Sequence, residues 1–211
     1  MSELREHVVL LHGLWMRGFT LVSLRRRLEA AGFSVDLFDY ASVLQDSLSS
    51  IEKLLAHTAR NTAEKVHFVG HSLGGLIALQ TLRHQPSLIE GRVVCLGSPL
   101  RGSAIARALS NVPGGAFLLG RNVPMLRDGI ERWDGTQQVG AIAGRLPIGL
   151  GVAFGSLSVP HDGTVSVEET QLPGLTDHGV VAASHTGLLF SEDAANQTAA
   201  FLRGGRFDSS P

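Results

Sequence analysis

Short apolar runs alternate with segments of helical spacing along this chain, and this alternation constrains the fold more than any other feature. Six runs have the length and apolar content of strands: residues 8–11, 33–40, 66–69, 92–96, 152–157 and 180–183. Helical spacing follows in residues 21–31, 44–59, 73–84 and 191–202. Strands joined through helices pair in parallel. The order predicts an α/β fold with a mostly parallel sheet of about six strands and helices on both faces.

The bulk composition is that of one globular domain over residues 1–211. The chain is 44% hydrophobic and 18% charged, which argues against disorder. Its formal net charge of -1 gives no sign of a nucleic-acid partner. No run of eighteen apolar residues predicts a membrane span, and we expect no stable membrane insertion. The start of the chain lacks the apolar stretch of a signal peptide, so we expect a cytoplasmic protein. The single cysteine, Cys95, lies in an apolar run and is expected to be a small buried residue.

Two parts of the chain do not fit the strand and helix pattern. Residues 111–149 are rich in Gly, Arg and Asp and are interrupted by Pro113, Pro124 and Pro147. This segment is either a lid or substrate-access loop, or one or two surface helices packed at the edge of the sheet. Residues 204–211 are expected to form a flexible tail.

Ser72 lies in the pentapeptide Gly-His-Ser-Leu-Gly of residues 70–74, between a buried strand and a helix. A turn from strand to helix forces strained backbone angles on the serine, and Gly70 and Gly74 provide the space that such a turn needs. The hydroxyl is then presented at the carboxyl edge of the sheet, where α/β folds bind ligands. The alternative is a serine that only caps the helix. The setting favours a nucleophile.

A serine nucleophile needs a histidine base and a carboxylate that orients it. Among the nine histidines, His161, His178 and His185 follow the helix after Ser72. His185 follows the last strand, at the carboxyl edge, whereas His178 opens that strand at the opposite edge. We therefore expect His185 to be the base.

For the acid we favour Asp162, in a turn that follows the expected strand 152–157. Asp177 is the main rival, but it precedes the last strand. Glu168 and Glu169 lie further past the turn. An Asp-Gly pair at 162–163 is also a common turn signal, so the alternative is a turn without chemistry.

These motifs together resemble the lipase and esterase group of α/β hydrolases. Residues 71–75, His-Ser-Leu-Gly-Gly, resemble the nucleophile elbow of that family, and the His-Gly-Leu of residues 12–14 resembles its oxyanion loop. Residues 97–103 resemble the segment after the next strand in bacterial triacylglycerol lipases. The Asp-Gly-x-Val of residues 162–165 resembles the family's acid loop, and the family keeps its catalytic histidine where His185 stands. The resemblance covers most of the chain outside residues 111–149, and it implies a compact fold with little or no cap domain.

The resemblance also implies two oxyanion donors, the N–H groups of Leu14 and Leu73. Trp15 stands where many relatives have glycine, in a His-Gly-x-Gly pattern. Trp15 and Met16 are expected either to wall an acyl pocket or only to pack against neighbouring loops. His71 belongs to the elbow and is expected to be structural while lining the pocket.

The sequence therefore predicts a serine hydrolase that cleaves carboxylic esters through an acyl-enzyme, with a small-molecule ester or lipid as substrate. It calls for no metal or organic cofactor. An acyltransferase or thioesterase with the same triad is one alternative. A binding protein that keeps the fold without catalysis is another. The oligomeric state is left open.

Overall fold

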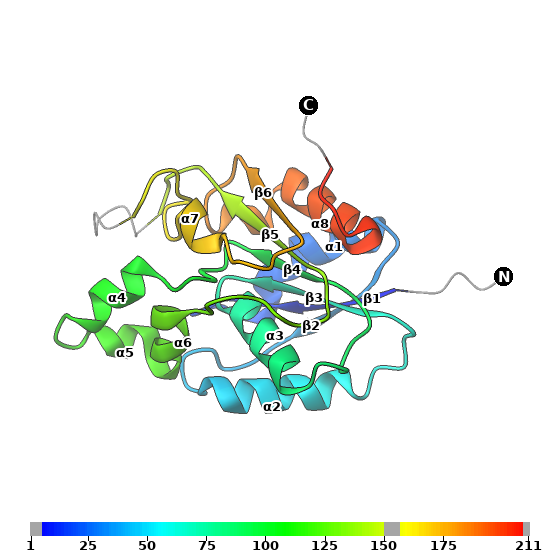
Figure 1. The fold of residues 1–211 in the computed structure, drawn as a ribbon, viewed down its shortest axis with the longest axis horizontal. Helices are drawn as coiled ribbons and strands as arrows, with labels where there is room; N and C mark the ends of the chain where they lie inside the picture. The colour runs from blue at the N-terminus through cyan, green and yellow to red at the C-terminus, as the bar shows by residue number, and fades with distance from the viewer. Residues whose placement is uncertain (1–5, 150–156, 209–211) are drawn as a thin grey trace.

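The computed structural model describes residues 6–149 and 157–208. Six strands form one sheet in the order β2-β1-β3-β4-β5-β6, and every neighbouring pair is parallel (Figure 1). This confirms the expected α/β fold class. The strands are β1 His7–Leu11, β2 Ser34–Phe38, β3 Val66–His71, β4 Val93–Leu96, β5 Val139–Gly144 and β6 Asp177–Val181.

Helices cover both faces of the sheet, as Figure 1 shows. On one face lie α1 Val22–Ala30 and α8 Glu192–Gly204, and on the other lie α2 Ser47–Thr58 and α3 Leu73–His84. Each face has its own apolar core, because strands buried on both sides carry apolar residues in continuous runs. The thiol of Cys95 is buried in β4, and burial raises its pKa to about 12. Cys95 is therefore a packed core residue, as expected.

The fifth strand differs from the sequence expectation. The expected strand 152–157 falls outside the described residues except for Leu157, which is in no strand. The sheet instead receives Val139–Gly144, from within the segment without an assigned pattern. Its sequence, Val-Gly-Ala-Ile-Ala-Gly, is poor in the branched residues that mark strands. Gly140 is small for a packing reason, because a Cβ there would lie 2.8 Å from the Phe201 ring and 2.7 Å from Phe207.

Short helices outside the sheet fill most of the chain between β4 and residue 128. After β4 come α4 Ala104–Ser110, α5 Gly115–Leu119, the 3-10 turn η2 Gly120–Asn122 and α6 Val123–Asp128. They project from the sheet on the side where α4, α5 and α6 are labelled in Figure 1. The buried side chain of Asn122 donates to the carbonyls of Ser42 and Gln45, at 2.7 and 3.0 Å, and ties this group to the loop after β2.

Three short elements complete the chain: η1 Gly18–Leu21, α7 Val167–Thr170 and η4 Gly187–Leu189. Past α8, residues 205–208 run beside β6. The N–H of Phe207 donates to Asp177 at 2.8 Å, and its ring packs 4.9 Å from that of Phe201. Within the described ranges, no helix has the length and apolar character needed to cross a membrane.

Candidate active site

Ser72 occupies a sharp turn between β3 and α3. Its backbone angles, φ 54° and ψ −120°, lie in a region that non-glycine residues rarely adopt. Two glycines make the turn possible. A Cβ on Gly70 would lie 2.3 Å from the backbone nitrogen of Gly75, and one on Gly74 would lie 2.5 Å from the carbonyl oxygen of Leu11. The first turn of α3 is thus pressed against the carboxyl ends of β1 and β3, with Ser72 at its N-cap.

His185 and Asp162 are joined by a hydrogen bond. The Nδ1 of His185 lies 2.7 Å from Oδ2 of Asp162, and the N–H of His185 donates to the Asp162 carbonyl at 2.9 Å. The Asp162 carboxyl group is buried, and its other oxygen accepts N–H groups from Thr164 and Val165 at 2.9 and 2.7 Å. The carboxylate is held in one orientation. Because Nδ1 donates to it, Nε2 of the neutral His185 ring is left to accept a proton.

Asp162 reaches the carboxyl edge from a strand other than the one expected. It is separated from β5 by residues 145–161, yet its Cβ would lie 2.8 Å from a Cβ on Gly144, the last residue of that strand. Asp162 therefore lies beside the carboxyl end of β5, the neighbour of β6 in the described sheet.

Gly97, at the end of β4, brings the serine turn and the His–Asp pair together. A Cβ on Gly97 would lie 3.1 Å from Oδ2 of Asp162 and 3.2 Å from Nδ1 of His185. The residue before it, Leu96, accepts the N–H of Ser72 on its carbonyl at 2.8 Å. Within the described chain no hydrogen bond joins the Ser72 hydroxyl to His185. Such catalytic bonds are often long until substrate binds.

His71 supports His185 from inside the sheet. Its ring is buried and lies 4.7 Å from the His185 ring, and its Nε2 is 2.9 Å from the His185 carbonyl oxygen. Burial, followed by the neighbouring His185, lowers the pKa of His71 to about 3. His71 is therefore a neutral donor to the backbone of His185. Sequence reasoning placed it at the elbow but gave no sign of this bond.

Two backbone N–H groups close to Ser72 have no hydrogen-bond partner among the described residues. Leu73 is the first residue of α3, and Leu14 lies in the turn after β1. Neither N–H donates a hydrogen bond to any of the described residues. The loop of Leu14 lies against Ser72, because a Cβ on Gly13 would be 3.0 Å from the Ser72 Cβ. Unpaired N–H groups at a helix N-terminus attract negative charge.

His12 and Tyr40 hold the base of that loop. The Tyr40 hydroxyl donates to the His12 carbonyl at 2.6 Å, and the two rings stack with centroids 4.3 Å apart. The His12 Nδ1 lies 2.9 Å from the Gly13 carbonyl oxygen, and burial lowers the pKa of His12. The His12 ring and the Tyr40 hydroxyl therefore fix the backbone just before Leu14. The sequence analysis did not single out Tyr40.

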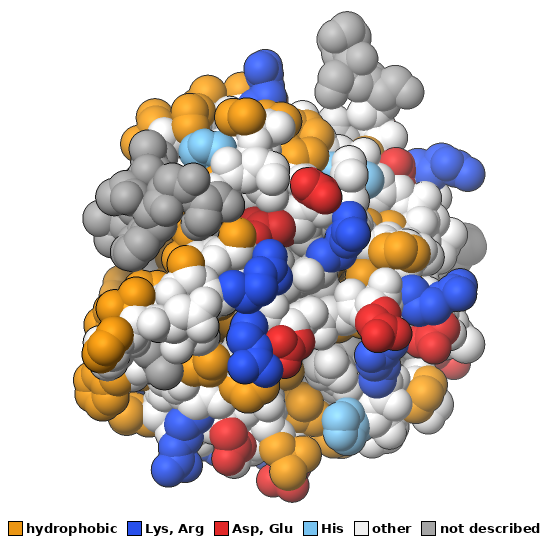
Figure 2. All heavy atoms as spheres, turned by 60° about the vertical axis from the view of Figure 1, so that its left-hand side comes forward, with side chains coloured by type: hydrophobic (Ala, Val, Ile, Leu, Met, Phe, Trp, Pro, Cys, Tyr) orange, Lys and Arg blue, Asp and Glu red, His pale blue; other side chains and the backbone are white. Residues whose placement is uncertain are grey.

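The residues expected near a substrate pocket have different surroundings. The Met16 side chain is half-buried against the α1 and α8 core, whereas Trp15 is 64% exposed and its indole N–H donates to the Leu118 carbonyl of α5. Exposed apolar side chains continue over α5 with Phe117 and Leu118. Figure 2, which looks partly onto this side, shows apolar side chains along one rim and Lys and Arg side chains nearer the middle.

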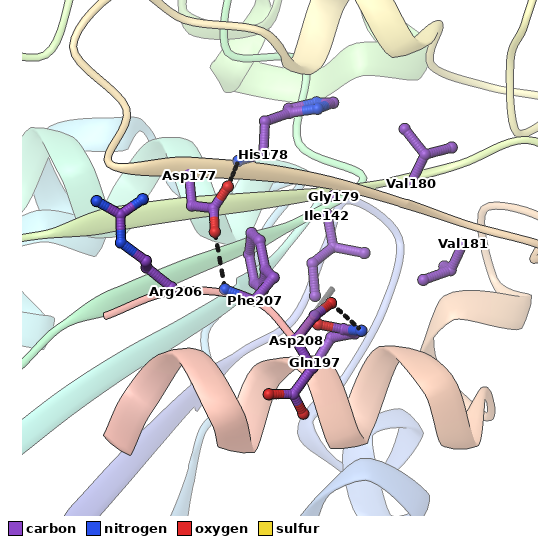
Figure 3. A pocket seen from close by; sticks show the side chains of 10 residues that line it. All are labelled: Ile142, Asp177, His178, Gly179, Val180, Val181, Gln197, Arg206, Phe207 and Asp208. Atoms are coloured by element: carbon purple, nitrogen blue, oxygen red, sulfur yellow. Dashed lines mark hydrogen bonds between the residues drawn. The ribbon is translucent and has the colours of Figure 1, made fainter. Parts of the chain in front are cut away.

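The rival residues lie elsewhere. Asp177 and His178 line a pocket of about 360 Å³ beside β6, where the Asp177 carboxylate accepts the N–H groups of His178 and Phe207 (Figure 3). The His178 ring is 2.8 Å from the Thr170 hydroxyl. Glu169 caps a helix and Glu168 is exposed. None of these carboxylates hydrogen-bonds to a histidine ring in the described residues.

The sequence model of the alpha/beta hydrolase family matches residues 8–155, which include the serine turn and the loop after β1. The chain belongs to the alpha/beta hydrolase family. No curated protein sequence matches it.

Solved structures of lipases and esterases share this alpha/beta hydrolase fold. A lipase of Bacillus licheniformis in its propeptide form superposes with a TM-score of 0.79 at 18% identity, over 100% of this chain and 53% of the lipase. A metagenomic carboxyl esterase gives 0.68 at 19% identity, over 88% of this chain and 66% of the esterase. A soluble variant of the Saccharomyces cerevisiae monoglyceride lipase gives 0.65 at 14% identity, with 96% and 87% covered. The chain thus spans between half and two thirds of the first two proteins, and identities this low show the fold alone.

Proposed function

We propose that this alpha/beta hydrolase cleaves carboxylic esters through an acyl-enzyme, with Ser72, His185 and Asp162 as its catalytic triad. The observation that carries the proposal is the hydrogen bond of 2.7 Å between His185 and the buried Asp162, beside a serine in a strained strand-to-helix turn. Strained residues of this kind persist where the surrounding structure holds them, and they cluster at functional sites.

In the first step, Ser72 attacks the ester carbonyl while Nε2 of His185 takes the hydroxyl proton. Asp162 keeps the ring in the tautomer that can accept that proton, and stabilises the imidazolium that forms. The tetrahedral oxyanion is held by the N–H groups of Leu14 and Leu73. Each such donor is worth roughly a hundredfold or more in kcat. His185 then gives its proton to the departing alcohol, and the acyl group remains on Ser72.

In the second step, His185 takes a proton from water, and the resulting hydroxide attacks the acyl-enzyme. The second tetrahedral intermediate uses the same two N–H donors. Its collapse returns the proton from His185 to Ser72 and releases the carboxylic acid. Every group that this cycle needs comes from the chain itself.

The substrate class follows from the surroundings of the triad. Exposed apolar side chains of Trp15, Phe117 and Leu118 lie on the side of the molecule that the carboxyl edge faces. They favour an ester with an apolar acyl or alcohol part. The lipases and the esterase with the same fold support this choice. His71 is buried and engaged with His185, so we assign it a positioning role rather than a wall of the pocket.

Hydrolysis of p-nitrophenyl esters of increasing acyl length tests the proposal. Wild type should hydrolyse them and react with a fluorophosphonate probe, whereas Ser72→Ala should lose both. Ser110→Ala is the matched control, because this serine bonds to its own helix at Ala106 and should change neither. Equal probe labelling of wild type and Ser72→Ala would sink the assignment. Labelling of Ser72 without hydrolysis at any acyl length would favour transfer to an acceptor other than water.

A further inference from the structure

Trp15 has an unusual backbone for its residue type. Of the residues that the structure describes, Trp15 and Ser72 are the two non-glycine residues with positive φ, at 60° and 54°. A bulky side chain in this region is strained and needs its surroundings to hold it. Ser72 is held by the strand and helix on either side. Trp15 lies in a loop, next to the oxyanion donor Leu14, and must be held in another way.

A hydrogen bond from the Trp15 indole fixes the backbone of this residue. Its ring is 64% exposed, so packing does little to fix it. Its N–H donates to the Leu118 carbonyl at 2.7 Å, across 103 residues of sequence. On the loop side, the turn is closed by the Met16 N–H, which lies 3.4 Å from the Gly13 carbonyl oxygen. The indole bond is the shorter of these two contacts.

The other end of this bond lies on an element that is itself fixed. Leu118 is in α5, and the next residue, Leu119, is buried in the core. The N–H of Arg121 then donates to the Val43 carbonyl, and Asn122 anchors the chain to Ser42 and Gln45. The carbonyl of Leu118 is therefore a defined point outside the sheet. The loop that contains Leu14 is therefore fixed at two points, by Tyr40 through the carbonyl of His12 and by α5 through the Trp15 indole.

We propose that Trp15 is a positioning residue that couples α5 to the oxyanion hole. The indole bond to Leu118 keeps Trp15 at positive φ, and this backbone angle lets the Met16 N–H turn back to the Gly13 carbonyl. The peptide that carries this carbonyl also carries the Leu14 N–H, so the closed turn keeps that N–H facing the oxyanion. A movement of α5 alters transition-state stabilisation through this one side chain. The inference rests on the proposed ester hydrolysis.

Trp15→Phe tests the coupling, because it keeps an aromatic ring and removes the N–H. We expect kcat to fall about fivefold at every acyl length, as the loss of one hydrogen bond implies, with KM unchanged. Trp133→Phe is the matched control. The Trp133 indole also donates to a carbonyl, that of Gln137 at 2.9 Å, and it is buried. The carbonyl of the preceding residue accepts a hydrogen bond from Arg83 in the last turn of α3, whereas the serine turn precedes the first turn of that helix. The kcat of Trp133→Phe should stay at the wild-type value.

Three results would overturn the coupling. One is an unchanged kcat in Trp15→Phe. Another is a loss in Trp15→Phe that Trp133→Phe reproduces. The third is an effect of Trp15→Phe confined to KM and growing with acyl length, which would make Trp15 a pocket wall instead. If wild type neither hydrolyses the esters nor reacts with the probe, the proposed function itself is refuted. In that case Trp15 fluorescence in Trp133→Phe still reports on the indole bond.

A double-mutant cycle gives a second readout. A Cβ on Gly120, which has φ 62°, would lie 2.4 Å from the Val43 carbonyl oxygen, so Gly120→Ala must shift the end of α5. In Trp133→Phe, where Trp15 is the sole tryptophan, Gly120→Ala should change the Trp15 emission. Gly120→Ala should also lower kcat in wild type and have no further effect in Trp15→Phe. Independent effects of the two substitutions on kcat would contradict the coupling.

Discussion

Asp162 uses both carboxylate oxygens, one on His185 and one on two backbone N–H groups. In Asp162→Asn, the amide oxygen can still accept those N–H groups, but the amide NH2 then faces Nδ1 of His185. The ring hydrogen must move to Nε2, which can no longer take the proton of Ser72. We expect kcat to fall about 10⁴-fold, as for the same change in other triads.

Steady-state kinetics together with a thermal melt would measure this effect. Asp128→Asn serves as the control, because Asp128 is exposed and pairs with Arg127. A loss smaller than tenfold in Asp162→Asn would show that another group orients His185.

Tyr40 holds the backbone of the loop after β1, so its substitution should change both stability and kcat. Tyr40→Phe keeps the ring stacked on His12 but removes the donor to the buried His12 carbonyl. An unpaired buried carbonyl costs about 1–3 kcal/mol, so urea unfolding should show a loss of that size. Because the same carbonyl lies two residues before Leu14, a proposed oxyanion donor, kcat should fall as well. Unchanged stability and kcat would mean that the stacked ring alone holds the loop.

The residues of the candidate triad could be predicted because their types and their places after strands carry the signal. Tyr40, His71 and Trp15 show the limit. Their roles depend on hydrogen bonds to residues 28, 114 and 103 positions away in the sequence. The sequence around each residue does not predict such a distant contact. The glycine that many relatives have at position 15 was the single hint that this backbone needs a positive φ.

At the scale of elements, Glu169 joins two helices with one carboxylate. One oxygen accepts the N–H of Ala104, the first residue of α4, at 2.5 Å, and the other accepts that of Ser166, the N-cap of α7, at 2.8 Å. Glu169→Gln replaces one acceptor by a donor that faces an N–H group. We expect a loss of about 1–2 kcal/mol in the free energy of unfolding, the usual cost of a lost cap.

Urea denaturation measures this loss, with Glu168→Gln as the matched neighbour. The side chain of Glu168 is exposed, with a distant partner in Arg101, and its substitution should leave stability unchanged. Equal effects of the two substitutions would show that charge, rather than the two caps, is responsible.

The elements also show where sequence patterns fail. α3 has the predicted bounds, because buried apolar spacing and a glycine-rich start define it. β5 is not apparent in the sequence because Gly and Ala interrupt its apolar run. Gly140 leaves room for Phe201 and Phe207, a need that arises from α8 and the tail rather than from the strand itself. Short helices such as α5 and α6 depend on anchors like Asn122, which no local pattern reveals.

At the scale of the whole molecule, burial lowers the pKa values of several histidines. Burial lowers the pKa of His67 to about 4 and that of His71 to about 3, and it also lowers the pKa values of His7, His12 and His178. In the unfolded chain these rings take up protons below about pH 6.5. The unfolded state then binds more protons than the folded state, so stability falls as the pH decreases from 6.5 towards the folded pKa values.

His67 and His71 should each lower the free energy of unfolding by about 1.4 kcal/mol per pH unit between pH 6.5 and their folded pKa values, and the other three add to this loss. Urea unfolding at steps from pH 7.5 to 4.5 measures the slope. In His67→Gln the amide oxygen can still accept the Arg92 N–H, but the side chain no longer takes up a proton. The free energy of unfolding should therefore depend less steeply on pH than in wild type, by the contribution of one histidine. A flat profile over this range would contradict the buried, neutral state of these rings.

The central claim is that Ser72 carries the acyl group, and trapping the acyl-enzyme tests it most directly. The protein is mixed with p-nitrophenyl acetate, quenched in acid, digested and analysed by mass spectrometry. We predict an acetyl group on Ser72 in wild type, and none on the corresponding peptide of Ser72→Ala. An acetyl group on another residue, or continued turnover by Ser72→Ala, would contradict the account.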